Sequence, residues 1–216
     1  MCWNKDVSLN TFIFSSFVLG LIIYNNTYTQ YKIDELNSIW VYLFLMSFIL
    51  IQLIEYFIWL NIKNPLYNGV FTMLATLLLL VQPIVSTMLI TNKIVQQKML
   101  YSYILFIIPV ALYKFNVKKI NSSVSDLGHL RWNTVVSYDT ILDKLFSLIW
   151  GFFFLFPLFY QGYNFGLLFG SLTLIILIYN FYKDKSIGSM WCWIVNAGML
   201  YYAGYLLFYL PFLEQI

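Results

Sequence analysis

The chain alternates long apolar runs with short polar segments. Seven such runs can be marked, and none shows the two-residue alternation of hydrophobic and polar positions that membrane β-barrel strands require. A helix needs about 20 consecutive apolar residues to cross the hydrocarbon of a bilayer. The pattern therefore predicts an all-α fold, a bundle of about seven transmembrane helices. The expected spans are residues 7–24, 39–60, 70–91, 99–113, 145–160, 165–182 and 187–212.

The seven runs differ in how well they fit a full crossing. The second, third and seventh are long enough to cross unaided. The fourth and fifth are short and contain Pro109 and Pro157, so a tilted or a re-entrant helix stays an alternative for each. The runs follow one another closely, and residues 1–216 are expected to form a single transmembrane domain.

Composition agrees with this pattern. Hydrophobic residues make up 61% of the 216 residues and charged residues only 10%, with a mean hydropathy of +0.77. A soluble domain has about 45–50% apolar and about 25% charged residues. The main expected partner is therefore the lipid bilayer. The net charge of +3 is small and spread along the chain, so nucleic acid is not an expected partner.

The basic residues divide unequally between the two sides of a seven-span arrangement. Cytoplasmic loops of membrane proteins carry an excess of Lys and Arg. One side holds nine basic residues, namely Lys5, Lys63, Lys114, Lys118, Lys119, Arg131, Lys144, Lys183 and Lys185. The other side holds three, namely Lys32, Lys93 and Lys98. This asymmetry predicts a cytoplasmic N-terminus and an extracellular or lumenal C-terminus.

An acidic residue interrupts the second run, which reads FILIQLIEYFIWL over residues 48–60. An ionised carboxylate at the centre of a membrane helix costs about 2.5–3.5 kcal/mol on insertion scales, so such groups usually face the bundle interior. Gln52 lies three residues before Glu55 and Trp59 four residues after it, which places all three on one helix face. Glu55 is either a functional group or a structural one that joins neighbouring helices by hydrogen bonds.

Three further polar residues are candidates for the same region. Gln82 lies near the middle of the third span beside Pro83, whose missing N–H frees a backbone carbonyl one turn earlier. A packing role in a kinked helix is the alternative for this pair. Asn180 ends the sixth span, and Asn196 lies inside the seventh. We expect these groups to share one half of the membrane with Glu55.

The longest connection, residues 114–144, contains the only histidine, His129, close to Arg131. Connections of this length are usually functional or disordered. Histidine changes charge near neutral pH, although a lone loop histidine can also be a simple interfacial side chain. Our hypothesis is a polar cavity open to the cytoplasm, with Glu55 at its base and His129 or Arg131 closing over it.

Cysteines and glycines suggest weaker possibilities. Cys2 and Cys192 are too few for a disulfide framework, and each is either inert or a site of reversible acylation. One histidine and no close ligand pairs make a zinc site unexpected, and no cofactor is predicted. Gly166 and Gly170 form a GxxxG pattern in the sixth span, which permits close helix contact within the bundle or between copies in a homo-oligomer.

Several short motifs carry a resemblance to a known family. They are MCWNKDVS at residues 1–8, QLIEYFIW at 52–59, Gln82-Pro83, HLRW at 129–132 and WCW at 191–193. Together they resemble an uncharacterised multi-pass membrane family of large DNA viruses and protists. The resemblance spans most of the chain and implies no activity. Seven spans also invite comparison with rhodopsins, but residues 187–212 contain no lysine that could hold retinal.

The sequence leaves three classes of function, in this order. The first is a small channel or carrier for protons or a small polar solute or ion, with Glu55 as the titrating or binding group and Gln52 and Gln82 beside it. The second is a non-catalytic scaffold or receptor that binds a partner protein or a lipid. The third is an intramembrane enzyme that uses Cys192 or His129 with Glu55. Fold alone does not decide among them.

Overall fold

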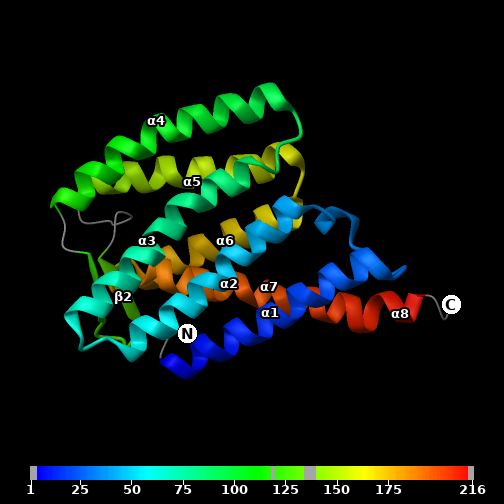
Figure 1. Cartoon of the computed structure of the whole chain (residues 1–216), viewed down its shortest axis with the longest axis horizontal. Helices are drawn as coiled ribbons and strands as arrows, with labels where there is room; N and C mark the ends of the chain where they lie inside the picture. The colour runs from blue at the N-terminus through cyan, green and yellow to red at the C-terminus, as the bar shows by residue number, and fades with distance from the viewer. Residues whose placement is uncertain (1–3, 118–119, 134–139, 214–216) are drawn as a thin grey trace.

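The computed structural model describes residues 4–117, 120–133 and 140–213. Within these residues, seven helices are long and apolar enough to cross a membrane, and Figure 1 shows them packed into one bundle. By length and composition they suggest an integral membrane protein. The helices are α1 (Lys5–Tyr28), α2 (Ile39–Leu60), α3 (Pro65–Thr87), α4 (Lys93–Val117), α5 (Ile141–Gln161), α6 (Asn164–Phe181) and α7 (Ile187–Gly204).

Each expected span corresponds to one of these helices, so the predicted helical bundle is confirmed. α4 and α5 have 25 and 21 residues, longer than the apolar runs within them, and both are long enough to cross. The seventh span is less regular than expected. After α7 the chain continues through a π-helical turn, Tyr205–Tyr209, into the short helix α8, Leu210–Leu213.

Polar side chains next to the apolar runs set the helix ends. Asn4, Ser38 and Asn64 each accept a hydrogen bond from a backbone N–H in the first turn of α1, α2 and α3, which satisfies a donor that the helix itself leaves unpaired. Thr140 begins α5 with a capping box. Gly162 caps the C-terminal end of α5 (Gln161), and its φ of 81° lies in the left-handed region that favours glycine.

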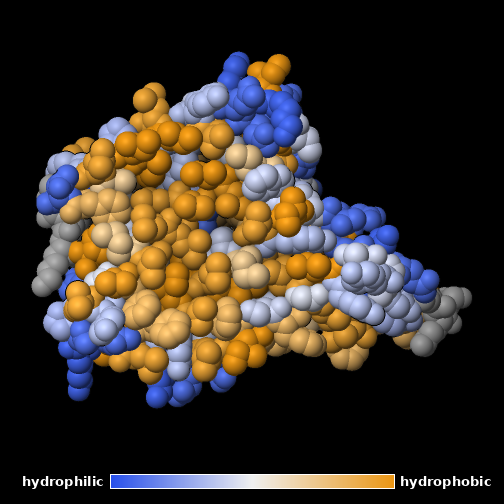
Figure 2. Space-filling model, in the orientation of Figure 1, coloured by the Kyte–Doolittle hydropathy of each residue, from blue (hydrophilic) through white to orange (hydrophobic). Residues whose placement is uncertain are grey.

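The outer surface matches a protein immersed in lipid. In Figure 2 hydrophobic residues cover the middle of the visible face, and hydrophilic residues gather toward the ends of the helices. Many large apolar side chains are exposed along the helices, such as Phe17 on α1, Leu105 on α4 and Ile175 on α6. In water such a surface would drive association, whereas in a bilayer it faces acyl chains.

A small antiparallel hairpin follows α4. β1 (Asn121–Val124) pairs with β2 (Leu130–Asn133), and Gly128, with a φ of 80°, provides the left-handed residue in the turn. Asn68 of α3 fastens β1: its Oδ1 accepts from the Ser122 backbone N–H at 2.7 Å, and its Nδ2 donates to the Ser122 carbonyl at 3.1 Å. The sequence prediction of a purely helical fold missed this hairpin.

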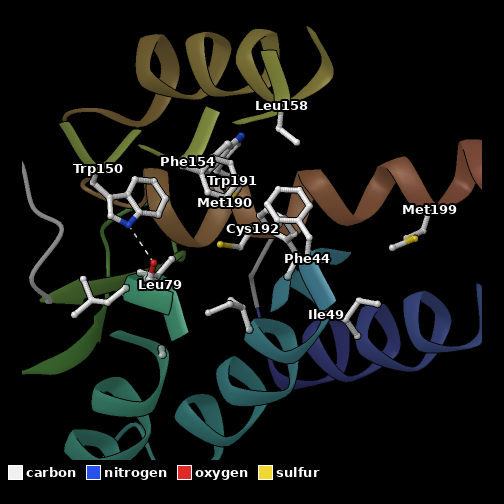
Figure 3. Close-up of a cluster of buried hydrophobic side chains, with 14 of the residues drawn as sticks. Phe44, Ile49, Leu79, Trp150, Phe154, Leu158, Met190, Trp191, Cys192 and Met199 are labelled. Atoms are coloured by element: carbon white, nitrogen blue, oxygen red, sulfur yellow. Dashed lines mark hydrogen bonds between the residues drawn. The ribbon is translucent and has the colours of Figure 1, made fainter. Parts of the chain in front are cut away.

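The core is strongly aromatic where α2, α5 and α7 meet. The Trp150 and Phe154 rings of α5 stack at 5.3 Å between centroids, and Trp191 of α7 meets Phe154 edge-on at 5.4 Å. Phe48 of α2 packs against both Phe154 and Trp191. Figure 3 shows side chains of these helices converging on this region. Such edge and stacked contacts fix ring orientation in addition to burying area.

Candidate functional site

Glu55 lies inside the seam between α2 and α7. Its side chain is fully buried. Ser189 of α7 donates its hydroxyl to Glu55 Oε1 at 2.5 Å, and the Gln52 amide donates to Oε2 at 3.1 Å. A buried carboxyl group needs such donors because its desolvation is otherwise very costly. The carboxyl group therefore links α2 to α7.

Asn196 belongs to the same seam. Its Nδ2 donates to the carbonyl of Cys192 at 2.7 Å, and more weakly to the carbonyl of Phe48 on α2 at 3.4 Å. The structure thus brings together Gln52, Glu55 and Asn196, with Asn196 about two helical turns from Ser189 along α7.

Gln82 lies apart, on α3. Both atoms of its amide are buried and have no hydrogen-bond partner among the described residues. Its neighbour Pro83 lacks an N–H, so the carbonyl four residues earlier, on Leu79, has no helical donor. The Trp150 indole N–H of α5 donates to that carbonyl at 3.1 Å, as the dashed line in Figure 3 shows. The expected free carbonyl is therefore used to join α3 to α5.

Asn180 and His129 both contact residues of α6. Asn180 is exposed on α6 and donates locally to the carbonyl of Ile176 at 2.7 Å. His129 is buried in the hairpin turn with its ring edge-on to Phe181. Burial lowers the pKa of the His129 imidazole below its ordinary value, although the nearby Asp184 carboxylate acts in the opposite direction.

Asp184 anchors the hairpin to the turn between α6 and α7. Its Oδ2 accepts hydrogen bonds from the hydroxyls of Ser186 at 2.6 Å and Ser125 at 2.7 Å. Burial alone would raise the pKa of Asp184, but these two bonds, a backbone N–H from Leu127 and the charge of His129 together hold it below its ordinary value. The hairpin is therefore tied to α3 on one side and to this turn on the other.

A large pocket lies between α5, α6 and α7, and the sequence did not predict it. Its volume is about 810 Å³, and Leu79 of α3 and the end of β2 also contribute to it. Most of its wall is aliphatic or aromatic, including Phe152, Leu155 and Phe156 of α5. Glu55 is not among the residues that line it, whereas its partner Ser189 is. Pockets of about 300–1,000 Å³ are typical of small-molecule sites.

One end of this pocket is basic. Arg131 of β2, Lys144 of α5 and Lys185 of the α6–α7 turn all line it. The Lys144 ammonium lies over the ring of Tyr182, 5.5 Å from its centroid, and Arg131 Nε donates to the Ser123 hydroxyl at 3.2 Å. Among the described residues that line the pocket, none is acidic. We call these three residues the basic mouth.

The aromatic core forms the floor of the pocket. Trp150 and Trp191 both line it, and each indole N–H is held by a backbone carbonyl, that of Leu79 for Trp150 and that of Gly170 for Trp191 at 3.1 Å. Cys192 also lines the pocket, with only 1% of its surface exposed. The floor is therefore built from rings whose orientations are fixed from two neighbouring helices.

The remaining candidates are the two cysteines, the GxxxG glycines and a metal site. Cys2 lies outside the described residues, so acylation there stays a prediction, as it does for Cys192. A Cβ added at Gly166 or Gly170 would meet nothing within 4 Å, so neither glycine is needed for close packing inside this bundle. The homo-oligomer contact through them also stays a prediction. Within the described ranges, no three His, Cys, Asp or Glu residues are grouped as metal ligands.

Within the described residues, the protein is a bundle of seven helices that are long and apolar enough to cross a membrane, with a pocket between α5, α6 and α7 that is basic at one end. Comparison with known family models, with curated proteins and with solved structures gives no match to the chain. The arrangement of the site itself is therefore the guide to function.

Proposed function

We propose that the protein binds a lipid with an anionic head group in the pocket between α5, α6 and α7. This belongs to the second class that the sequence left open, a membrane receptor or scaffold that binds lipid. The observation that carries it is the polarity of the pocket: a long apolar wall that ends in the basic mouth of Arg131, Lys144 and Lys185, with no acidic side chain among the described lining residues.

The dimensions suit an acyl or alkyl chain. On α5 the lining residues extend from Lys144 to Phe159, which corresponds to about 22 Å along the helix axis. The hydrocarbon of a bilayer is about 30 Å thick, so the pocket covers more than one leaflet's depth. The apolar part of a bound lipid would lie along this wall while its head group stays at the mouth.

The charges suit an anion. Each cation attracts an anionic head group more strongly beside an apolar wall than in bulk water, because the effective dielectric constant there is lower. Lys144 and Lys185 are exposed at the end of the bundle, where a head group could approach from the membrane surface. The positive-inside asymmetry would place this end in the cytoplasm, whose leaflet is rich in anionic lipids.

The first experiment measures binding of a single-chain alkyl phosphate, the alkyl carboxylate of equal chain length and the corresponding neutral alcohol to the purified protein in neutral detergent. We expect both anions to bind more tightly than the alcohol. Comparison of the phosphate with the carboxylate shows which of these two anionic head groups the pocket binds more tightly. Equal affinity for all three compounds would refute the role of the basic mouth.

Pocket filling gives the second test. Gly151 lines the pocket, and a Cβ there would meet nothing within 4 Å, so we expect Gly151→Leu to add an isobutyl group to the pocket wall without displacing the helix. Gly20→Leu on the exposed side of α1 is the matched control, since it too meets nothing within 4 Å. We expect Gly151→Leu to weaken alkyl phosphate binding and Gly20→Leu to leave it unchanged. Unchanged binding in both variants would refute the site.

A second candidate function is the carrier that the sequence placed first. One observation favours it: Ser189 both lines the pocket and donates to Glu55, so a bound solute and the buried carboxyl group share a neighbour. Proteoliposomes should then show a solute or proton flux that Glu55→Gln reduces. Equal flux with wild-type protein and Glu55→Gln, or none with either, would end this hypothesis.

A further inference from the structure

A second internal feature lies on the other side of α7, between α1, α2 and α7. Five buried polar atoms there have no hydrogen-bond partner among the described residues. They are Ser8 Oγ and Ser15 Oγ of α1, Gln52 Oε1 and Trp59 Nε1 of α2, and Asn196 Oδ1 of α7. None of these residues takes part in the lipid pocket.

These atoms lie along one seam. Trp193 of α7 donates its indole N–H to the Thr11 hydroxyl of α1 at 3.1 Å, and Ser8 and Ser15 lie three residues before and four residues after Thr11, on the same face of α1. On α2, Gln52 and Trp59 share a face with Glu55, which Ser189 of α7 contacts. All three helices therefore direct polar groups toward a common interior.

The seam is polar over about half the bilayer. Trp59 lies at the end of α2 and Ser8 near the start of α1, at the same end of the bundle. The carbonyl of Phe48, beside Asn196, is eleven residues from Trp59, or about 16 Å along the helix. Beyond this depth the seam becomes apolar, closed by the fully or almost fully buried Val18, Leu19, Ile22 and Met199.

Unpaired buried polar atoms are costly. A buried donor or acceptor left without a partner costs about 1–3 kcal/mol, and native proteins satisfy most such groups with protein atoms or ordered water. Five in one seam would amount to a large penalty if it were dry. Buried water molecules typically make two to four hydrogen bonds to such groups, and the mixture of hydroxyl, amide and indole partners here suits them.

We propose that the seam between α1, α2 and α7 holds a chain of ordered water molecules that connects Glu55 with the end of the bundle where α1 begins. Among the described residues, Glu55 supplies the one carboxyl group along these water molecules. It therefore exchanges protons with the end of the bundle where α1 begins. The apolar closure beyond Asn196 makes the path a half-channel. α7 separates it from the lipid pocket, and the Ser189 hydroxyl lies between the two.

Water-edited solid-state NMR in bilayers tests this proposal, because it measures how quickly magnetisation passes from water to individual side-chain amides. Gln52 and Asn196 should receive it about as fast as Asn116, which is exposed on α4. Asn68 is the control, a buried amide fully occupied by protein partners, and it should receive magnetisation slowly. Transfer to Gln52 and Asn196 as slow as that to Asn68 would overturn the proposal.

A paired substitution tests the assigned residues. Ser8→Ala with Ser15→Ala removes two water partners while alanine maintains the helix, so transfer to Gln52 should slow markedly. Ser47→Ala is the matched control, because the Ser47 hydroxyl is already satisfied by the carbonyl of Phe44 at 2.6 Å. If the double substitution leaves the transfer rate to Gln52 unchanged, or if Ser47→Ala slows it equally, the proposal is also overturned. These signals are independent of lipid binding, so this proposal and the lipid site can fail separately.

Discussion

The ion pair between Lys114 and Asp143 allows the sharpest test of the packing. Lys114 lies in the last turn of α4 and Asp143 in the first turn of α5, and their side chains are 2% and 4% exposed. The Lys114 ammonium also lies 5.6 Å from the centroid of the Phe146 ring. Both charged groups are shielded from water, so their attraction to each other offsets part of the cost of burying them.

Replacing one partner leaves the other charge buried. Lys114→Met keeps most of the apolar stem but removes the ammonium, and breaking a buried pair in this way costs about 3–5 kcal/mol. Lys98→Met is the control on the same helix, since Lys98 is exposed and surface changes are usually within about 0.5 kcal/mol. The measurement is unfolding by SDS in mixed micelles, followed by tryptophan fluorescence.

The double variant separates the pair from other effects. Asp143 also accepts a hydrogen bond from the Thr140 backbone N–H at 3.1 Å, and Asp143→Asn retains an oxygen for that bond. Lys114→Met and Asp143→Asn together should cost clearly less than the sum of the single changes, by about 0.5–3 kcal/mol, the coupling expected for residues in contact. Additive costs, or a Lys114→Met cost equal to that of Lys98→Met, would refute the reasoning.

Two further predictions concern the hairpin. His129 binds a proton less readily in the folded than in the unfolded protein, so the unfolding free energy should fall as pH drops below about 6.5. His129→Phe should flatten this slope. Asp184, whose pKa is lowered, should affect the stability only at lower pH. Asn68→Ala should leave the buried backbone of Ser122 unpaired, which costs about 1–3 kcal/mol, and should speed tryptic cleavage of the hairpin. The exposed control Asn116→Ala should not change the cleavage rate. A stability that does not depend on pH would contradict the first prediction, and equal resistance of the hairpin in both asparagine variants would contradict the second.

The helical layout was largely predictable because hydropathy reports burial in lipid directly. The second span, residues 39–60, matches α2 at both ends because Ser38 caps its first turn and polar residues follow Leu60. α4 begins at Lys93, six residues before the expected span, because a helix continues through polar residues that a hydropathy pattern excludes. The π-helical turn at Tyr205–Tyr209 changes only the hydrogen-bond register, which leaves no trace in apolarity.

The site was predictable only in part. The helix spacing of Gln52 and Glu55 indicated a shared face, and the structure places both in the α2–α7 seam. The pocket between α5, α6 and α7 depends on the distance of α5 from α6 and α7, a tertiary distance that no local pattern contains. A basic mouth drawn from Arg131, Lys144 and Lys185 could not be recognised either, because three separate elements contribute these side chains.

Pro83 limits which insertions and deletions α3 can accept while it stays attached to α5. The carbonyl that it leaves open is the one that receives the Trp150 indole, so a missing amide hydrogen on one helix determines where the other can attach. Successive residues are turned by about 100° around a helix. Moving the proline by a single position would therefore aim the open acceptor away from α5, and one-residue insertions or deletions between Leu79 and Pro83 should be tolerated far less than apolar exchanges at the same sites.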